Sequence, residues 1–127
     1  MALGAVGAMQ ACFEQTLAFV TGREDLRSQQ AVRHRMAEIA LELQVGRDVT
    51  YSALRRHVAG EDAVREVTIA KLRTQRAAVD VIDACLQIHG LDATPELERA
   101  LRDARLGPIG GGTDEIMKEI LGRSLGL

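Results

Sequence analysis

The sequence predicts an all-α protein, an up-and-down four-helix bundle with a short extra helix. Leu, Ala, Glu, Arg and Gln, all good helix formers, dominate the chain. Aromatic residues, which favour strands, make up only 2% of the residues, and this scarcity argues against a β-sandwich or barrel. Apolar side chains also recur at steps of three or four over long segments, which is typical of amphipathic helices.

Length and charge narrow the class of protein further. A chain of 127 residues suits one domain, so we expect residues 1–127 to form a single helical domain. Sixteen Lys and Arg against eighteen Asp and Glu argue against a nucleic-acid partner. No apolar run reaches the roughly 18 residues of a membrane span, so we expect no membrane contact. The two cysteines, Cys12 and Cys85, lack metal-type spacing, which favours a reducing, cytoplasmic location over a structural disulfide.

Residues 2–21 are predicted to form the first helix, which ends at Thr21-Gly22. Gly4 and Gly7 either weaken its first turns or permit a close contact with another helix. Its expected buried stripe consists of Leu3, Val6, Met9, Phe13, Leu17 and Val20.

Two long helices are predicted next, over residues 25–58 and 61–89, with Gly46 as a point where the first could bend. The acidic pair at 61–62 suits a first turn, and Gly90 suits a helix stop. Helices of about 30 residues span roughly 45 Å, so the pair should lie antiparallel in a bundle. Their expected buried faces are Val32, Met36, Ile39, Leu43, Leu54 and Val58, then Val64, Val67, Ala70, Thr74, Ala77, Val81, Cys85 and Ile88.

A short helix over residues 96–105 should follow, because Pro95 fits a first helical position. A last helix begins at Thr113, which can cap it. The inward residues of that helix are Ile116, Ile120 and Leu121.

Few side chains form a pattern that indicates a catalytic, metal-binding or ligand-binding site. His34, His57 and His89 lie on different segments without other ligands at helical spacing, so no metal site is predicted. The run Gly110-Gly111-Gly112-Thr113 could present free N–H groups to an anion or a polar heteroaromatic edge at a helix start. A flexible linker is an equal explanation of that run.

Several longer runs, taken in order, resemble the carboxy-terminal helical domain of the acyl-CoA dehydrogenase family. The resemblance covers essentially the whole chain. Its most specific parts are QIHG at 87–90, RDAR at 102–105 and GGTDEIMKEI at 111–120. Upstream, ALGAVG at 2–7, QAVRHRMAE at 30–38 and EVTIAKL at 66–72 resemble the same domain.

The resemblance implies a flavoprotein oxidoreductase of fatty acid metabolism. In the family, a glutamate removes the α-proton of an acyl-CoA thioester, and the flavin of FAD takes the β-hydride. The carboxy-terminal domain completes the FAD site, partly on the neighbouring subunit, and packs the homo-oligomer interfaces. The electron acceptor is often an electron-transferring flavoprotein, and substrate choice depends largely on the other two domains.

Seven positions match the family's cofactor contacts. Arg23 resembles the arginine that contacts the FAD pyrophosphate, and its fork suits phosphate oxygens. Gln30 resembles the glutamine of the family's FQ motif, and Gln87 and Gly90 resemble the family's QxHGG loop near the adenosine end of FAD. Thr113, Asp114 and Glu115 resemble the flavin contact.

The chain also departs from the family pattern. Glu24 and Asp25 follow Arg23 and bring negative charge near a phosphate, and Leu91-Asp92 replaces a Gly-Tyr-Gly run. These departures lower the FAD affinity expected of the isolated chain. The family's catalytic glutamate corresponds to Gly111, and other members carry that glutamate upstream of the first helix. No catalytic residue is therefore predicted, and the isolated chain should be inactive.

Two functions follow. The first is the carboxy-terminal domain of an acyl-CoA dehydrogenase, which completes the FAD site and the oligomer interface when the other domains are present. The second is a non-catalytic helical module for dimerisation or assembly.

Overall fold

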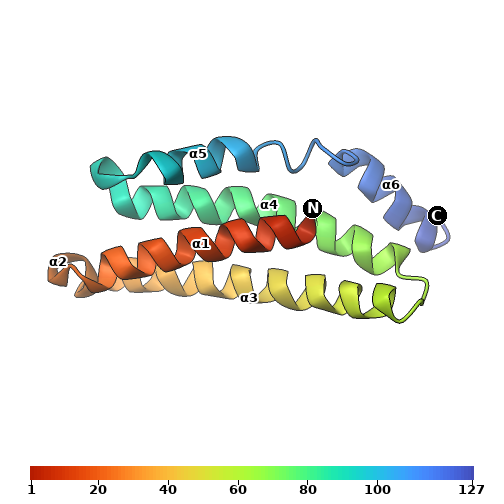
Figure 1. Cartoon of the computed structure of the whole chain (residues 1–127), viewed down its shortest axis with the longest axis horizontal. Coiled ribbons are helices and arrows are strands. Elements are labelled where there is room, and N and C mark those ends of the chain that lie inside the picture. The colour runs from red at the N-terminus through yellow and green to blue at the C-terminus, as the bar shows by residue number, and fades with distance from the viewer.

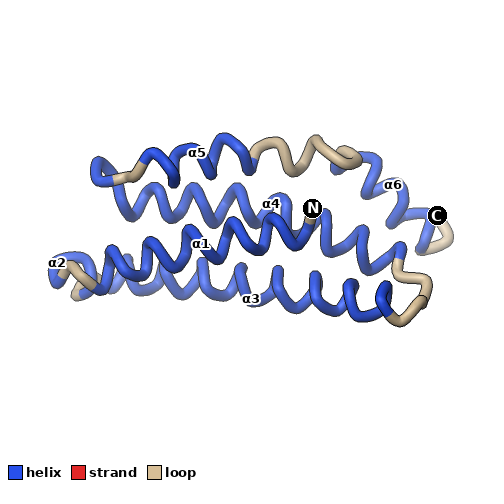
Figure 2. The backbone as a smooth tube through the Cα atoms, in the orientation of Figure 1, coloured by secondary structure: helices blue, strands red, loops and turns tan.

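The computed structural model describes all residues, 1–127, and every regular element in it is a helix. Short loops join the helices, as Figure 2 shows. The prediction of an all-α, up-and-down bundle is confirmed. The elements are α1 (Ala2–Thr21), α2 (Glu24–Arg27), α3 (Gln30–Val58), α4 (Val64–His89), the 3-10 turn η1 (Gly90–Asp92), α5 (Pro95–Ala104) and α6 (Asp114–Ser124).

The helices run along one long axis (Figure 1). Helix α3 is antiparallel to α1 and α4, and α5 and then α6 follow α4 back along its length. Helix α4 is central, because it contacts α1, α3, α5 and α6. The turn with α2 lies at the same end as the α4–α5 junction, and α6 lies at the end where α3 joins α4 (Figure 1).

Gly46 marks the place where α1 packs closely on α3. A Cβ atom there would lie 3.2 Å from Met9 Cε and 3.9 Å from Val6 Cγ2. Helix α3 continues through this glycine, so Gly46 permits a close helix contact rather than a break. Gly4 and Gly7 have open space beside them. No other helix of this chain packs closely against either glycine.

The predicted helix over 25–58 is wrong at its start, because the chain breaks at Ser28-Gln29 between α2 and α3. The Arg33 guanidinium donates hydrogen bonds to the carbonyl oxygens of Arg27 and Ser28, at 3.2 and 2.8 Å. The side chain thereby satisfies two carbonyls that a continuous helix would have bonded internally. Gln29 is extended, with φ −79° and ψ 125°.

Two other boundaries refine the prediction. Helix α4 begins at Val64 rather than residue 61, and Asp62 accepts a hydrogen bond from the Val64 N–H at 3.2 Å. Gly90 ends α4 with φ +56°, a conformation that L side chains rarely adopt. Thr94 and Thr113 cap α5 and α6 by accepting from Leu97 N and Ile116 N.

The buried core confirms only part of the predicted apolar faces. The fully buried side chains include Met9, Val81, Ile82, Cys85 and Leu97, and both cysteines are free. No helix is long and apolar enough to cross a membrane. Six residues expected to face inward are exposed, because no helix of this chain lies across them: Leu3, Leu17, Val58, Val64, Val67 and Ile116.

Candidate functional site

The first polar cluster surrounds Arg23 at the α2 end of the bundle. The Arg23 guanidinium donates a hydrogen bond to Asp92 Oδ2 at 2.6 Å and lies 3.6 Å from an Asp25 oxygen. The bond to Asp92 is the main cause that raises the pKa of Arg23, followed by the charge of Asp25. The Arg23 guanidinium, which was expected to bind the FAD pyrophosphate, is therefore paired with two carboxylates of its own chain.

Behind Arg23 lies a stack of flat groups that the sequence analysis missed. The guanidinium carbon is 5.1 Å from the centre of the Phe19 ring, and this ring stacks on His89 with centroids 4.1 Å apart. His89 Nε2 lies 3.2 Å from Thr16 Oγ1, whereas Nδ1 has no partner. Burial lowers the pKa of His89, and the nearby Asp92 opposes that change.

Gln30, Gln87 and Gly90 lie at the same end of the bundle as Arg23 and are exposed. Gln30 Nε2 lies 3.5 Å from His34 Nε2, and Gln87 Nε2 donates to Asp83 Oδ2 at 2.6 Å. Each amide bonds to a neighbour on its own helix, one turn away. The structure thus brings four of the predicted cofactor residues to one end.

The other three predicted residues begin α6, at the opposite end. The Thr113 hydroxyl oxygen accepts from Ile116 N at 3.4 Å and so caps the helix. Glu115 is exposed, and its own backbone N–H and the Thr113 hydroxyl lower its pKa. Asp114 is buried; its Oδ2 accepts from Arg76 Nε at 2.5 Å, and its Oδ1 has no partner. Asp114 therefore fixes α6 to α4.

The glycine loop before α6 is held by two side chains of α4 that the sequence analysis did not single out. The ammonium group of Lys71 donates a hydrogen bond to the Gly112 carbonyl oxygen, and Gln75 packs where a Cβ on Gly107 would stand. Lys71 is buried and has no carboxylate within 4.0 Å. The lack of a side chain at Gly107 leaves room for the Gln75 amide.

Gly111, the position matched to the family glutamate, presents no acid to the surrounding space. The Met1 side chain packs against it, and its φ is +63°. No group of three or more His, Cys, Asp and Glu residues is arranged to hold a metal ion.

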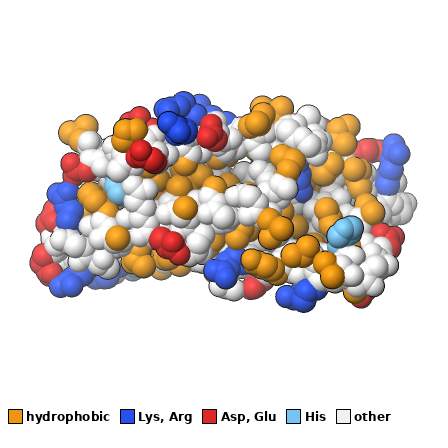
Figure 3. Space-filling view, viewed as in Figure 1, with side chains coloured by type: hydrophobic (Ala, Val, Ile, Leu, Met, Phe, Trp, Pro, Cys, Tyr) orange, Lys and Arg blue, Asp and Glu red, His pale blue; other side chains and the backbone are white.

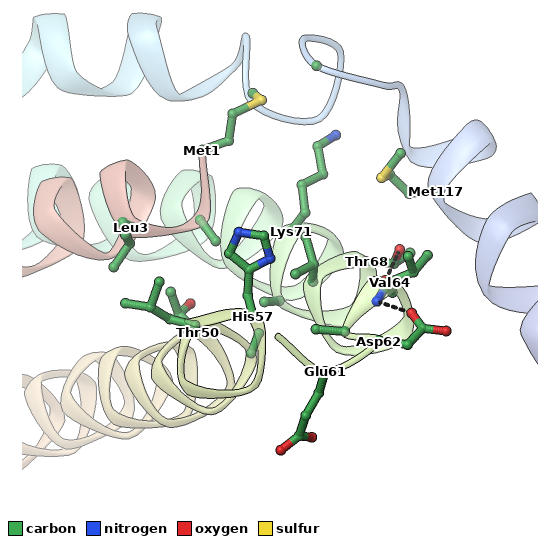
Figure 4. Close-up of a pocket in the computed structure, with 17 residues that line it drawn as sticks. Met1, Leu3, Thr50, His57, Glu61, Asp62, Val64, Thr68, Lys71 and Met117 are labelled. Atoms are coloured by element: carbon green, nitrogen blue, oxygen red, sulfur yellow. Dashed lines mark hydrogen bonds between the residues drawn. The ribbon is translucent and has the colours of Figure 1, made fainter. Parts of the chain in front are cut away.

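An open groove of about 710 Å³ lies beyond the start of α1 (Figure 4). Helices α3 and α4 form its floor, and Gly111 and Met117 border it. In Figure 4, the Lys71 side chain extends from α4 toward the glycine loop, and His57 rises from α3. Ten of the 17 lining residues are hydrophobic, so the groove is an apolar surface.

Fold and site define an all-α bundle domain whose candidate polar groups lie at its two ends rather than in its core. The family model described as "Acyl-CoA dehydrogenase, C-terminal domain" matches residues 1–126. The chain therefore belongs to the acyl-CoA dehydrogenase family and corresponds to the carboxy-terminal domain of that family.

Individual relatives agree with this assignment. The probable acyl-CoA dehydrogenase YngJ of Bacillus subtilis is 31% identical over 95% of this chain and 34% of its own length. A crystal structure of a probable acyl-CoA dehydrogenase from Mycobacterium abscessus superposes with a TM-score of 0.92 at 33% identity, over 98% of this chain and 35% of that one. The FAD complex of PigA gives a TM-score of 0.90 at 30% identity, over 97% and 34%. The chain thus spans about a third of the length of these relatives.

Proposed function

We propose that this chain forms one wall of an acyl-CoA dehydrogenase, where it completes the FAD site and packs the homo-oligomer interface. The reaction of the whole enzyme would be the α,β-dehydrogenation of an acyl-CoA thioester. The rest of the enzyme would supply the acyl-CoA cleft, and the isolated chain would be inactive. An electron-transferring flavoprotein as electron acceptor and a location in the cytoplasm are further expectations for the whole enzyme.

The observation that carries the proposal is the separation of the candidate cofactor residues into two groups. Gly90 ends α4, whereas Asp114 is bound to Arg76, fourteen residues earlier on the same helix. At 1.5 Å per residue, that interval is roughly 21 Å. This layout is expected of a chain whose two ends contribute to two different cofactor sites, each shared with a neighbouring subunit.

The residues at the Arg23 end fit FAD in part. A guanidinium can bind two phosphate oxygens at once, and the exposed amides of Gln30 and Gln87 could bond to the adenosine. The obstacle is the engagement of Arg23 by Asp92 and Asp25, since a pyrophosphate must displace or outweigh these carboxylates. We therefore expect these contacts to form only in an assembled enzyme. In the assembled enzyme, the flavin of FAD would be the hydride acceptor.

The second group would position the flavin end. The Thr113 hydroxyl accepts a bond from the backbone and faces the exposed Glu115 carboxylate, so a flavin atom would have to compete with that carboxylate for the hydroxyl proton. Gly111 offers no base, and a base must lie within hydrogen-bond reach of the proton that it removes. The family's alternative position for the glutamate, upstream of the first helix, would bring it close to Gly111, because Met1 packs there.

One experiment tests this function directly. The purified chain is mixed with FAD, alone and with a polypeptide that carries the part of a relative preceding its matched region. A bound yellow chromophore and a higher melting temperature are expected only for the mixture, since a ligand that binds the native state must stabilise it. An Arg23→Met variant should weaken FAD retention in the mixture. Equal retention by both would exclude Arg23 as a contact.

The second candidate function is a helical assembly module without a cofactor. The exposed apolar residues Val58, Val64 and Val67 favour it, because an exposed apolar patch commonly marks a protein interface. Size-exclusion chromatography of the chain alone tests it. A strict monomer that binds neither a copy of itself nor the complementing polypeptide would contradict this function.

A further inference from the structure

We propose that Cys12 and Cys85 form a redox modification site, at which hydrogen peroxide joins α1 to α4 through a reversible disulfide. Both thiols are free in this structure and lie in the core, 5% and 0% exposed. The site requires neither FAD nor the proposed enzymatic function, because it depends only on how the two helices pack side by side.

The register of α1 on α4 places the two cysteines opposite each other. The two helices are parallel, because α3 is antiparallel to both (Figure 1). Thr16 of α1 contacts His89 of α4, with 3.2 Å between Oγ1 and Nε2, and these residues are 73 positions apart. Cys12 and Cys85 lie one turn earlier on their helices and have the same separation. Since parallel helices rise equally per residue, the two cysteines lie at the same level.

Other buried pairs have this separation along the contact between α1 and α4. Ala5 and Ala78 both line the hollow between α1 and α5, and Met9 and Ile82 have no exposed surface. The small alanines let the helices approach closely. With axes about 8–10 Å apart and Cα atoms about 2.3 Å from each axis, directly facing residues have Cα atoms roughly 4–6 Å apart. A disulfide requires a Cα separation of about 4.4–6.8 Å, so the register suits one.

The surroundings of the pair favour a small, uncharged oxidant. Figure 3 shows hydrophobic side chains between α1 and α5, in front of α4, and a charged oxidant would lose its hydration there. Burial, and then the charge of the neighbouring Cys85, raises the pKa of Cys12 to about 11. The thiolate is the reactive form, so we expect the reaction to be slow and to occur when α1 opens locally from α4.

The reaction consumes one peroxide for each pair of thiols. One sulfur, as its thiolate, attacks a peroxide oxygen; the S–O bond forms, the O–O bond breaks, and the departing hydroxide takes a proton and leaves as water. The second sulfur then attacks the resulting sulfenic sulfur. The S–S bond forms, the S–O bond breaks, and the hydroxide leaves as a second water with the proton of the second thiol. Two thiols are thereby oxidised to a disulfide, and hydrogen peroxide is reduced to two waters.

Oxidation of the purified chain with hydrogen peroxide tests the site. The expected product is a monomer that has lost two hydrogen atoms by mass spectrometry and, once denatured, has no thiol that reacts with maleimide. Its melting temperature should be roughly 10 °C higher, because a cross-link over this separation restricts the unfolded chain. Dithiothreitol should reverse both changes.

A register variant keeps the test specific. Cys85→Ala combined with Ala78→Cys retains two cysteines on the same buried faces, but moves one of them by seven residues, or roughly 10 Å along the helix axis. This variant should form no internal disulfide and gain no thermal stability on oxidation. An internal disulfide that forms as readily in the variant as in the unchanged chain would overturn the proposal. Two thiols that stay free in the unchanged chain, their oxidation to sulfinic acids, or a disulfide-linked dimer would overturn it as well.

Discussion

Met1 packs against Gly111 so closely that a Cβ atom on Gly111 would overlap the methionine sulfur. This contact joins the start of α1 to the glycine loop before α6, although the two are far apart in the sequence. Gly111 also has φ +63°, so its conformation disfavours any other residue, even if the flexible Met1 side chain moves away.

The first prediction concerns this position. Gly111→Glu should lower the free energy of unfolding by about 2 kcal/mol, because the glutamate must adopt a left-handed conformation. Gly122→Glu is the matched control, since Gly122 lies in α6 with open space around it. Urea denaturation measures both changes. Equal stability of the two variants would show that the loop conformation at Gly111 is not restrained.

The second prediction concerns the contact of α1 with α3. Gly46→Leu should destabilise the chain by about 2–3 kcal/mol, because the added atoms meet Met9, Thr74 and Val6 in a packed interior. Gly7→Leu adds the same side chain to the exposed side of α1 and should be neutral or slightly stabilising. Thermal unfolding distinguishes these results. A harmless Gly46→Leu would mean that α1 is not seated as described.

The third prediction concerns the attachment of α6. Arg76→Gln should cost about 2 kcal/mol of unfolding free energy, since it leaves the buried Asp114 carboxylate without its charged partner. Arg123→Gln removes an exposed ion pair with Glu119 and should cost less than about 1 kcal/mol. Adding Asp114→Asn to Arg76→Gln should restore part of the loss. No recovery in the double variant would argue against an uncompensated charge.

The fourth prediction is a pH dependence due to His89. Burial lowers the pKa of folded His89 below the value of about 6.5 expected in the unfolded chain. The unfolded state therefore binds more protons below that pH, and stability should fall as pH decreases from about 6.5 toward the folded pKa. The slope from one proton is at most about 1.4 kcal/mol per pH unit.

His89→Gln should flatten this part of the stability curve, whereas His34→Gln, at an exposed position, should leave it unchanged. Urea denaturation at several pH values between 5 and 8 measures the slope. An unchanged slope in His89→Gln would assign the effect to other groups.

The fifth prediction follows from the pairing of Arg23 with Asp92. Asp92→Asn should free the guanidinium for phosphate and tighten FAD binding severalfold in the assembled mixture, because it removes a competing negative charge. The pair is exposed to solvent, so the stability of the chain should change little. Asp80→Asn, at an exposed position on α4, is the control for net charge. Equal FAD affinity in both variants would contradict a role for Arg23 in phosphate binding.

Local signals in the sequence located most helix ends. Gly90, Pro95 and Thr113 act through their own backbone or side chain, so their effects can be predicted from a few neighbouring residues. The break at Ser28-Gln29 could not be predicted in this way. At this break the Arg33 side chain folds back onto two carbonyl oxygens, and nothing in helical periodicity signals that contact.

Burial was harder to predict than helix position. A repeat of apolar residues predicts an apolar face, but it does not show whether the same chain covers that face. Val64 and Val67 continue the stripe of α4 yet lie in the open groove. Conversely, Lys71 and Asp114 are polar residues that became buried through partners 41 and 38 residues away, which no local pattern reveals.

The position of the two polar clusters at opposite ends also has a genetic consequence. If each end serves a different cofactor site, one faulty copy impairs a site that a sound neighbour otherwise completes. A chain with a defective Arg23 and a chain with a defective Thr113 would then complement each other in a mixed assembly, because one of the two sites that they share would receive both intact ends.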